Sequence, residues 1–148
     1  MTEPLRAVFD TNVFVSALLS RNPTSPTQEL MRRWRAKEFV LLVSQALLVE
    51  LVEKLQERGI GQDQIQELLA TINRLAEWVD VSPKAVVPVI TADPDDDQIL
   101  ACAVVGGAHY LVTYDPHFDC LEGKHQNIKI TKALPFLWKV RGDQPPEP

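Results

Sequence analysis

Short apolar runs alternate with amphipathic segments of helical length, and this alternation constrains the fold more than any other feature of the chain. Apolar runs of this length are typical of strands that are buried on both faces of a sheet. The strands expected from them span residues 6–9, 39–43, 78–81, 110–113 and 128–130. Strands that alternate with helices predict an α/β protein whose mostly parallel sheet is covered on both faces.

The helices expected between these strands carry recognisable start and stop signals. Ser25 followed by Pro26, and Ser44 before its apolar stripe, are typical N-caps, and Thr11 or Asn12 is expected to cap the first helix. The expected helices span residues 13–19, 26–37, 45–58, 62–77, 94–105 and 132–140. Residues 82–91 contain two prolines and are expected to form an extended strap.

Length and composition point to one compact unit. The chain has 148 residues, of which 1–141 are expected to form a single domain and the proline-rich segment 142–148 a disordered tail. The longest apolar run, Ile99–Val105, is far shorter than the ~18 residues of a membrane span, so no membrane association is expected. Two cysteines and no apolar signal region at the start favour a cytoplasmic protein with free thiols.

Four carboxylates crowd into residues 93–97, just before an apolar helical run. A helix start explains some of them, since Asp93 suits the N-cap and acids favour the positive end of the helix dipole. A cap with excess surface charge remains an alternative. Asp96, however, lies three residues before Ile99 and therefore falls on the face expected to be buried. A buried carboxylate needs a partner, and a cation is the simplest one.

Three further acids occupy positions that suit the same site. Asp10 directly follows the first strand and Asp115 lies just past the fourth, so the two converge if these strands are neighbours. Glu50 lies about 60° outside the apolar stripe of its helix. The alternative for Glu50 is a surface pair with Lys54, four residues on. Thr113, beside Asp115, is expected to orient a ligand or a water molecule.

Carboxylates without a histidine or cysteine cluster suit hard cations, namely Mg²⁺ or Mn²⁺. Such ions activate water and stabilise leaving oxygens in phosphoryl transfer. Zinc held by His117, Cys120 and His125 is disfavoured because a fourth ligand is missing. The net charge of −5 argues against nucleic acid, but removing four metal-binding acids would leave −1.

Four motifs occur in a characteristic order: Phe9-Asp10-Thr11-Asn12, Glu50 within a helix, Asp96-Asp97-Gln98-Ile99-Leu100-Ala101 and Leu111-Val112-Thr113-Tyr114-Asp115. Over about residues 5–140 the chain resembles the PIN-domain ribonucleases, and most closely those that are toxins of prokaryotic toxin–antitoxin pairs. The resemblance implies a three-layer α/β/α sandwich and hydrolysis of RNA phosphodiesters that depends on Mg²⁺ or Mn²⁺.

The resemblance also assigns residues and partners. It implies that the four catalytic acids are Asp10, Glu50, Asp96 and Asp115. Metal would be held by Asp10, Asp96 and Asp115, with Asn12 and Thr113 as supporting polar residues and Asp93 as a secondary candidate. An antitoxin protein and a homodimer are further implications.

A non-catalytic module that binds RNA or protein is the alternative function, motivated by the negative charge. The best candidate RNA contacts are then basic residues on one helix: Arg32, Arg33, Arg35 and Lys37. Three aromatic residues, Trp34, Phe39 and Trp78, are expected in the core rather than at an interface.

Overall fold

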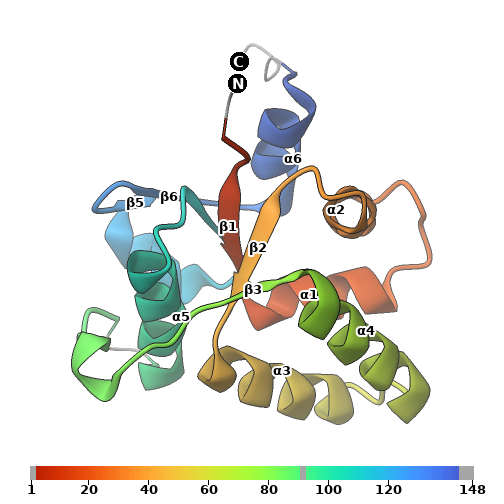
Figure 1. Cartoon of the computed structure of the whole chain (residues 1–148), viewed down its shortest axis with the longest axis horizontal. Helices are drawn as coiled ribbons and strands as arrows, with labels where there is room; N and C mark the ends of the chain where they lie inside the picture. The colour runs from red at the N-terminus through yellow and green to blue at the C-terminus, as the bar shows by residue number, and fades with distance from the viewer. Residues whose placement is uncertain (1–2, 91–92, 144–148) are drawn as a thin grey trace.

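The computed structural model describes residues 3–90 and 93–143, and these form a six-stranded sheet flanked by helices (Figure 1). The strand order is β3-β2-β1-β4-β6-β5, and only the β5–β6 pair is antiparallel. The strands are β1 (Arg6–Phe9), β2 (Val40–Val43), β3 (Glu77–Trp78), β4 (Tyr110–Val112), β5 (Lys124–His125) and β6 (Ile128–Thr131). The predicted α/β fold with a mostly parallel sheet is confirmed.

The helices pack around this sheet and against each other. They are α1 (Thr11–Leu19), α2 (Pro26–Arg35), α3 (Gln45–Glu57), α4 (Gln62–Leu75), α5 (Pro94–Val105) and α6 (Ala133–Arg141), with short 3-10 turns at Pro83–Ala85 and Pro116–Leu121. Helix α5 contacts β1, β2 and α3, and α1 contacts both α2 and α3. Helices α1, α3 and α5 thus meet near one end of the central strands (Figure 1).

Helix starts follow the sequence signals with one exception. Ser25, Ser44 and Asp93 are N-caps, and the side chain of each accepts a hydrogen bond from a backbone N–H of the first turn. The expectation that Thr11 or Asn12 caps the first helix is wrong, because Asp10 is the N-cap and its side chain accepts from the Thr11 N–H. Since β1 ends at Phe9, Asp10 alone connects this strand to helix α1.

The pairing of β1 with β4 determines where the acids meet. Phe9 is in register with Val112, and the Asp10 N–H donates to the Val112 carbonyl at 2.9 Å. The carboxyl ends of the two strands therefore lie side by side. The C-terminal end of helix α5 packs closely on the sheet because Gly106, just after it, has no side chain; a Cβ there would lie 2.9 Å from the side chains of Leu42 and Val79.

Three expectations about less regular segments are corrected. Trp34 and Phe39 are core residues, but Trp78 is 48% exposed because β3 is a two-residue edge strand. The short strand β5, which lacks an apolar run, was not predicted. The strap contains a 3-10 turn, and its last residue, Thr91, lies outside the described residues, as does the predicted disordered tail from residue 144 onward.

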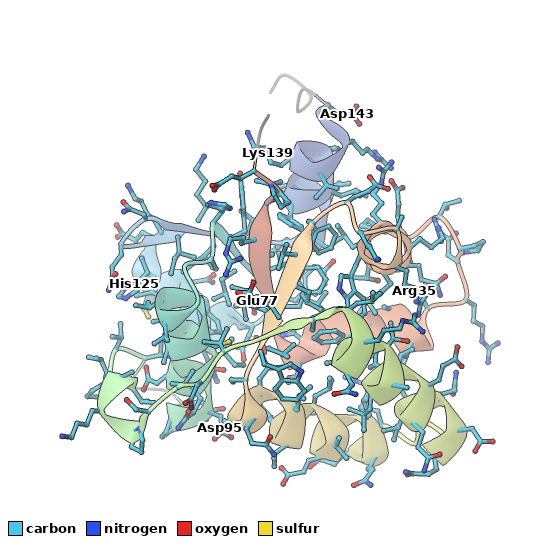
Figure 2. The ribbon with its side chains drawn as sticks, viewed as in Figure 1. Arg35, Glu77, Asp95, His125, Lys139 and Asp143 are labelled. Carbon is cyan, nitrogen blue, oxygen red and sulfur yellow. The ribbon has the colours of Figure 1, made fainter. Side chains whose placement is uncertain are left out.

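Charged side chains such as Arg35, Lys139 and Asp143 lie on the outside of the molecule (Figure 2). The largest buried side chains are apolar and come from the strands and from the inner faces of the helices. Within residues 3–90 and 93–143, no helix combines the length and the apolar character that crossing a membrane requires.

Candidate metal centre

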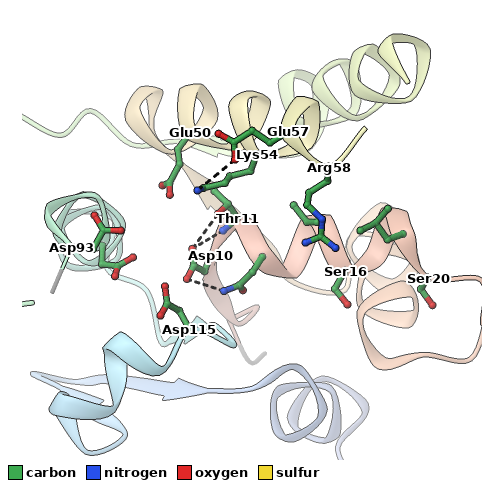
Figure 3. Close-up of a pocket in the computed structure, with 14 residues that line it drawn as sticks. Asp10, Thr11, Ser16, Ser20, Glu50, Lys54, Glu57, Arg58, Asp93 and Asp115 are labelled. Atoms are coloured by element: carbon green, nitrogen blue, oxygen red, sulfur yellow. Dashed lines mark hydrogen bonds and ion pairs between the residues drawn. The ribbon is translucent and has the colours of Figure 1, made fainter. Parts of the chain in front are cut away.

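Three carboxylates from distant parts of the chain converge at this edge of the sheet. One oxygen from each of Asp10, Asp96 and Asp115 lies within 4.8 Å of the other two. Asp10 follows β1, Asp96 lies in the first turn of α5, and Asp115 follows β4. Figure 3 shows Asp10 and Asp115 facing the same space, with Asp93 across from them.

Hydrogen bonds fix the orientation of Asp10, which is only 3% exposed. Its Oδ1 accepts from the Thr11 N–H at 2.7 Å, and its Oδ2 accepts from the Thr113 hydroxyl at 2.7 Å. The same Thr113 oxygen accepts from the Asp115 N–H at 2.9 Å. One hydroxyl therefore connects two of the three acids, so Thr113 acts as a positioning residue for this cluster.

Asn12 connects the same two strand ends by a second route. Its Nδ2 donates to Asp10 Oδ2 at 3.4 Å, and its Oδ1 accepts from the Tyr114 N–H at 3.2 Å. The two sequence-predicted supporting residues, Asn12 and Thr113, thus both contact Asp10.

The acids at the start of α5 have different surroundings. Asp96 is 2% exposed and faces the cluster, whereas Asp95 is exposed. Asp97 is also buried, but its Oδ1 accepts from the N–H groups of Val89 and Ile90 at 3.0 and 2.8 Å. Asp97 therefore holds the strap against α5. Of the two buried acids in this turn, it is Asp96 that belongs to the cluster with Asp10 and Asp115.

Burial and mutual repulsion raise the pKa values of these acids. Burial, together with the nearby carboxylates of Asp115 and Asp10, raises the pKa of Asp96 to about 6 against the opposing hydrogen bond from His117. Burial also raises the pKa of Asp10. The pKa of Glu50 rises to about 7, first through burial and then through the charges of Asp10 and the acids of α5. Such a cluster favours a cation that would offset this repulsion.

Glu50 lines the same space from α3 but does not belong to the three-carboxylate group. The alternative pairing with Lys54 is not seen in the described part of the chain. Lys54 instead lies 3.8 Å from Glu57. Glu50 is half-buried at the cleft, where the charges of Asp10 and of the acids of α5 raise its pKa and the charge of Lys54 lowers it.

His117 was missed as part of this site by the sequence analysis. Its Nδ1 lies 2.8 Å from Asp96 Oδ2 and 3.4 Å from Asp115 Oδ1. The candidate metal-binding groups among the described residues do not include Cys120 or His125. The zinc arrangement considered from the sequence is thus not formed, and His117 joins the acids instead. Its position two residues after Asp115 was the only available signal.

A cleft of about 660 Å³ extends from the acids along the space between α1 and α3. Lys54 and Arg58 line one wall, and Arg58 reaches toward Ser16 on α1 (Figure 3). The basic residues singled out from the sequence do not line this cleft; Arg33, for example, pairs with acids of its own neighbourhood.

The donor set fits a hard divalent cation. Mg²⁺ and Mn²⁺ prefer carboxylate oxygens and usually keep several waters, so few protein ligands suffice. The acids Asp10, Asp96 and Asp115 supply such oxygens at one point, with two of them almost completely buried. The arrangement can therefore hold an ion at the end of a cleft that is open to a larger ligand.

Comparisons with known proteins agree with this architecture. Among curated proteins, no significant match was found. Among solved structures, the chain is similar to one chain of VapBC2 from Rickettsia felis bound to a DNA fragment from their promoter. The identity is 18%, the TM-score is 0.59, and the alignment covers 85% of this chain and 97% of that chain, a likeness of fold. The model of the PIN domain family matches residues 6–117, so the protein belongs to this family.

Proposed function

We propose that the protein is a metal-dependent endoribonuclease that hydrolyses phosphodiester bonds of single-stranded RNA. The observation that carries this proposal is the convergence of Asp10, Asp96 and Asp115 within 4.8 Å at the end of an open cleft. Membership of the PIN domain family supports it, because PIN domains are generally nucleases.

The three carboxylates would hold Mg²⁺ or Mn²⁺ directly or through water. When bound, such an ion activates water and stabilises the charge on the leaving oxygen. Thr113 and Asn12 keep Asp10 in place by hydrogen bonds. Glu50, with a pKa of about 7, is suited to accept a proton from the attacking water near neutral pH.

The basic wall of the cleft gives the substrate a path. Lys54 lies on α3 and Arg58 is the C-cap of this helix four residues on, so both can contact phosphates of one RNA strand. Hydroxyl groups of Ser16 and Ser20 line the cleft beyond the acids. A single strand fits this path better than a duplex, because its phosphates can enter the cleft one at a time.

The test is cleavage of a mixed single-stranded RNA by the purified protein with Mn²⁺, with EDTA and with the variant Asp96→Asn. Asp95→Asn is the matched control, because it removes the same charge from an exposed position in the same helical turn. We expect cleavage that EDTA abolishes, that Asp96→Asn lowers at least about 100-fold, and that Asp95→Asn retains. Cleavage that persists in Asp96→Asn would refute the assignment.

The alternative, a non-catalytic module, makes a different prediction in the same experiment. Its motivation is the net charge of −5. It would leave the RNA intact under every condition, and RNA binding measured by fluorescence anisotropy would be the same for Asp96→Asn and for the unaltered protein.

We also propose that the protein is the toxin of a cytoplasmic toxin–antitoxin pair. The similar solved structure, VapBC2, supports a protein partner for this chain. An antitoxin could insert a basic side chain among the acids and block the cleft. Co-purification of a small partner from the native source that is weakened by Asp96→Asn would support this, and a homodimer would be revealed by the mass measured in solution.

A further inference from the structure

We propose that a groove between α1, α2 and α4 binds phosphate groups of the RNA away from the cleavage site, and that it gives the protein a preference for long single strands. This distal groove has a volume of about 430 Å³. Its lining includes Ala17 and Ser20 at the end of α1, Arg32 and Arg35 of α2, and Gln64 of α4. The inference rests on the proposed function, because the ligand is the same RNA strand.

The distal groove continues the cleft beside the acids along helix α1. Ser20, the C-cap of α1, lines both spaces. Figure 3 shows that Ser20 lies at the end of α1 that is farther from Asp10. Helix α1 has nine residues and is therefore about 13 Å long. An RNA strand whose scissile bond lies at the acids must extend several nucleotides along α1 to reach the distal groove.

Arg32 and Arg35 bring two guanidinium groups to the distal groove. They are three residues apart on α2 and so share one face of that helix. Arg32 Nη1 donates to the Pro23 carbonyl at 2.7 Å, which orients this side chain, and the guanidinium has four further N–H groups that can bind phosphate oxygens. Arg35 is exposed on the outside of the molecule (Figure 2).

The charges of these two arginines are not neutralised within residues 3–90 and 93–143. Arg33, on the same helix, lies 2.8 Å from a carboxylate oxygen of Glu29 and 2.6 Å from one of Glu38. In the described part of the chain, by contrast, neither Arg32 nor Arg35 forms an ion pair. Two unpaired guanidinium groups in one concave site attract an anion, and their planar arrangement of donors suits a phosphate group.

The distal groove is held open by bonds between the helices that form it. Gln28 of α2 donates from Nε2 to the carbonyls of Ala17 and Ser20, at 3.2 and 2.7 Å. These bonds connect the end of α1 to α2, so the groove exists before a ligand binds. RNA is favoured over an acidic protein segment because one strand can occupy the groove and the adjoining cleft together.

Fluorescence anisotropy of a labelled single-stranded RNA of about 16 nucleotides, with the full chain in EDTA so that no cleavage occurs, tests this inference. The double variant Arg32→Gln/Arg35→Gln should bind this RNA at least about tenfold more weakly at about 0.1 M salt. The slope of log affinity against log salt should decrease in magnitude by about 1.4, because two phosphate contacts are lost. With Mn²⁺, KM for this RNA should rise while kcat is unchanged, and an RNA of about 4 nucleotides should be cleaved as by the unaltered protein.

The matched control is Lys37→Gln/Arg74→Gln, which removes the same charge from exposed positions around a different hollow. It should retain the affinity, the salt slope and KM of the unaltered protein, and an equal Tm in both double variants verifies that they fold. Equal RNA binding by the two double variants would overturn the inference. So would a polyglutamate peptide that binds the groove more tightly than RNA of equal charge, since the groove would then be a protein site.

The same measurements distinguish failure of the distal groove from failure of the proposed function. Metal-dependent cleavage with equal binding by both double variants would retain the nuclease and refute the groove. RNA binding that only Arg32→Gln/Arg35→Gln weakens, without cleavage under any condition, would retain the groove and refute the nuclease.

Discussion

Glu29 and Asp96 are both largely shielded carboxylates, yet their pKa values move in opposite directions. Glu29 lies on α2, where Arg141 of α6 and Arg33 donate hydrogen bonds to it; these guanidinium groups lower its pKa to about 2. Burial and nearby acids raise the pKa of Asp96 to about 6. The first carboxylate has its counter-charges within the chain, and the second lies mainly among other carboxylates.

This difference separates a structural ion pair from a binding site. The bonds around Glu29 connect α2 to α6, and no further ligand is needed there. Within the described part of the chain, the potential cation that contacts the acids at the ends of β1 and β4 is the partly exposed imidazole of His117. A fold that concentrates buried negative charge in this way stores unfavourable electrostatic energy unless a cation binds.

The largest expected effect is stabilisation of the acidic site by metal. Mn²⁺ at about 100 times its dissociation constant should raise the free energy of unfolding by about 2.7 kcal/mol, equivalent to about 5–10 °C in Tm for a chain of this size. Calorimetric melting at pH 7.5 with and without Mn²⁺ measures this. A similar gain in Asp10→Asn would show that the ion binds elsewhere.

A smaller effect is expected when a positioning residue is changed. Thr113→Val keeps the shape of the side chain but removes the hydrogen bonds to Asp10 and from the Asp115 N–H. Metal affinity measured by titration calorimetry should fall about 10- to 100-fold. Thr131→Val, on the neighbouring strand β6, is the control and should bind metal normally. Equal affinity in both variants would contradict the role given to Thr113.

The pH dependence of the free energy of unfolding, measured on the metal-free protein, should sharpen the comparison between Asp96 and Glu29. A carboxyl group with a raised pKa binds its proton more tightly in the folded than in the unfolded state. Asp96 therefore contributes stability at low pH that is lost as the pH rises from about 4 through about 6. With EDTA present, the free energy of unfolding should fall by about 1–2 kcal/mol between pH 5 and pH 7.5.

Asp96→Asn is the reference for that measurement, because an amide does not titrate and the decrease should be smaller. A metal-free protein that becomes more stable over the same pH range would show that repulsion among the acids does not control its stability.

The smallest effect is expected at the other carboxylate. Glu29→Gln removes the charge that pairs with Arg33 and Arg141 and should cost about 1 kcal/mol at pH 7. Because the pKa of Glu29 is lowered, this contribution is present above about 4.5 and is lost as the pH falls toward 2. Urea unfolding at pH 7 and pH 2.5 measures the change. Mn²⁺ affinity should be unaffected, and a large decrease would break the distinction between the two regions.

Local patterns predicted most of the elements because their causes are local. Ser25, Ser44 and Asp93 cap helices through bonds to backbone groups only two or three residues away. Apolar runs predicted β1, β2, β4 and β6, which all lie between the edge strands β3 and β5. The short edge strand β5 was missed and Trp78 was placed wrongly in the core, because edge positions depend on which neighbours cover them.

The candidate site likewise combines residues whose positions the sequence predicted with contacts that it did not predict. The positions of Asp10 and Asp115 after apolar strands, and of Asp96 on the apolar face of its helix, were readable from the sequence. The different partners of Asp96 and Asp97 were not, since Asp97 is engaged by backbone groups of the strap. Nor was the contact between His117 and Asp96, which are 21 residues apart.

The sequence by itself determined the alternation of strands and helices, the helix starts, and the placing of acids at strand and helix ends. These features follow from backbone hydrogen bonding and side-chain periodicity over a few residues. Only the tertiary structure decided that β1 lies beside β4, that three of the acids meet within 4.8 Å, and that His117 joins them. Such meetings depend on pairing between segments about 100 residues apart, which no local pattern specifies.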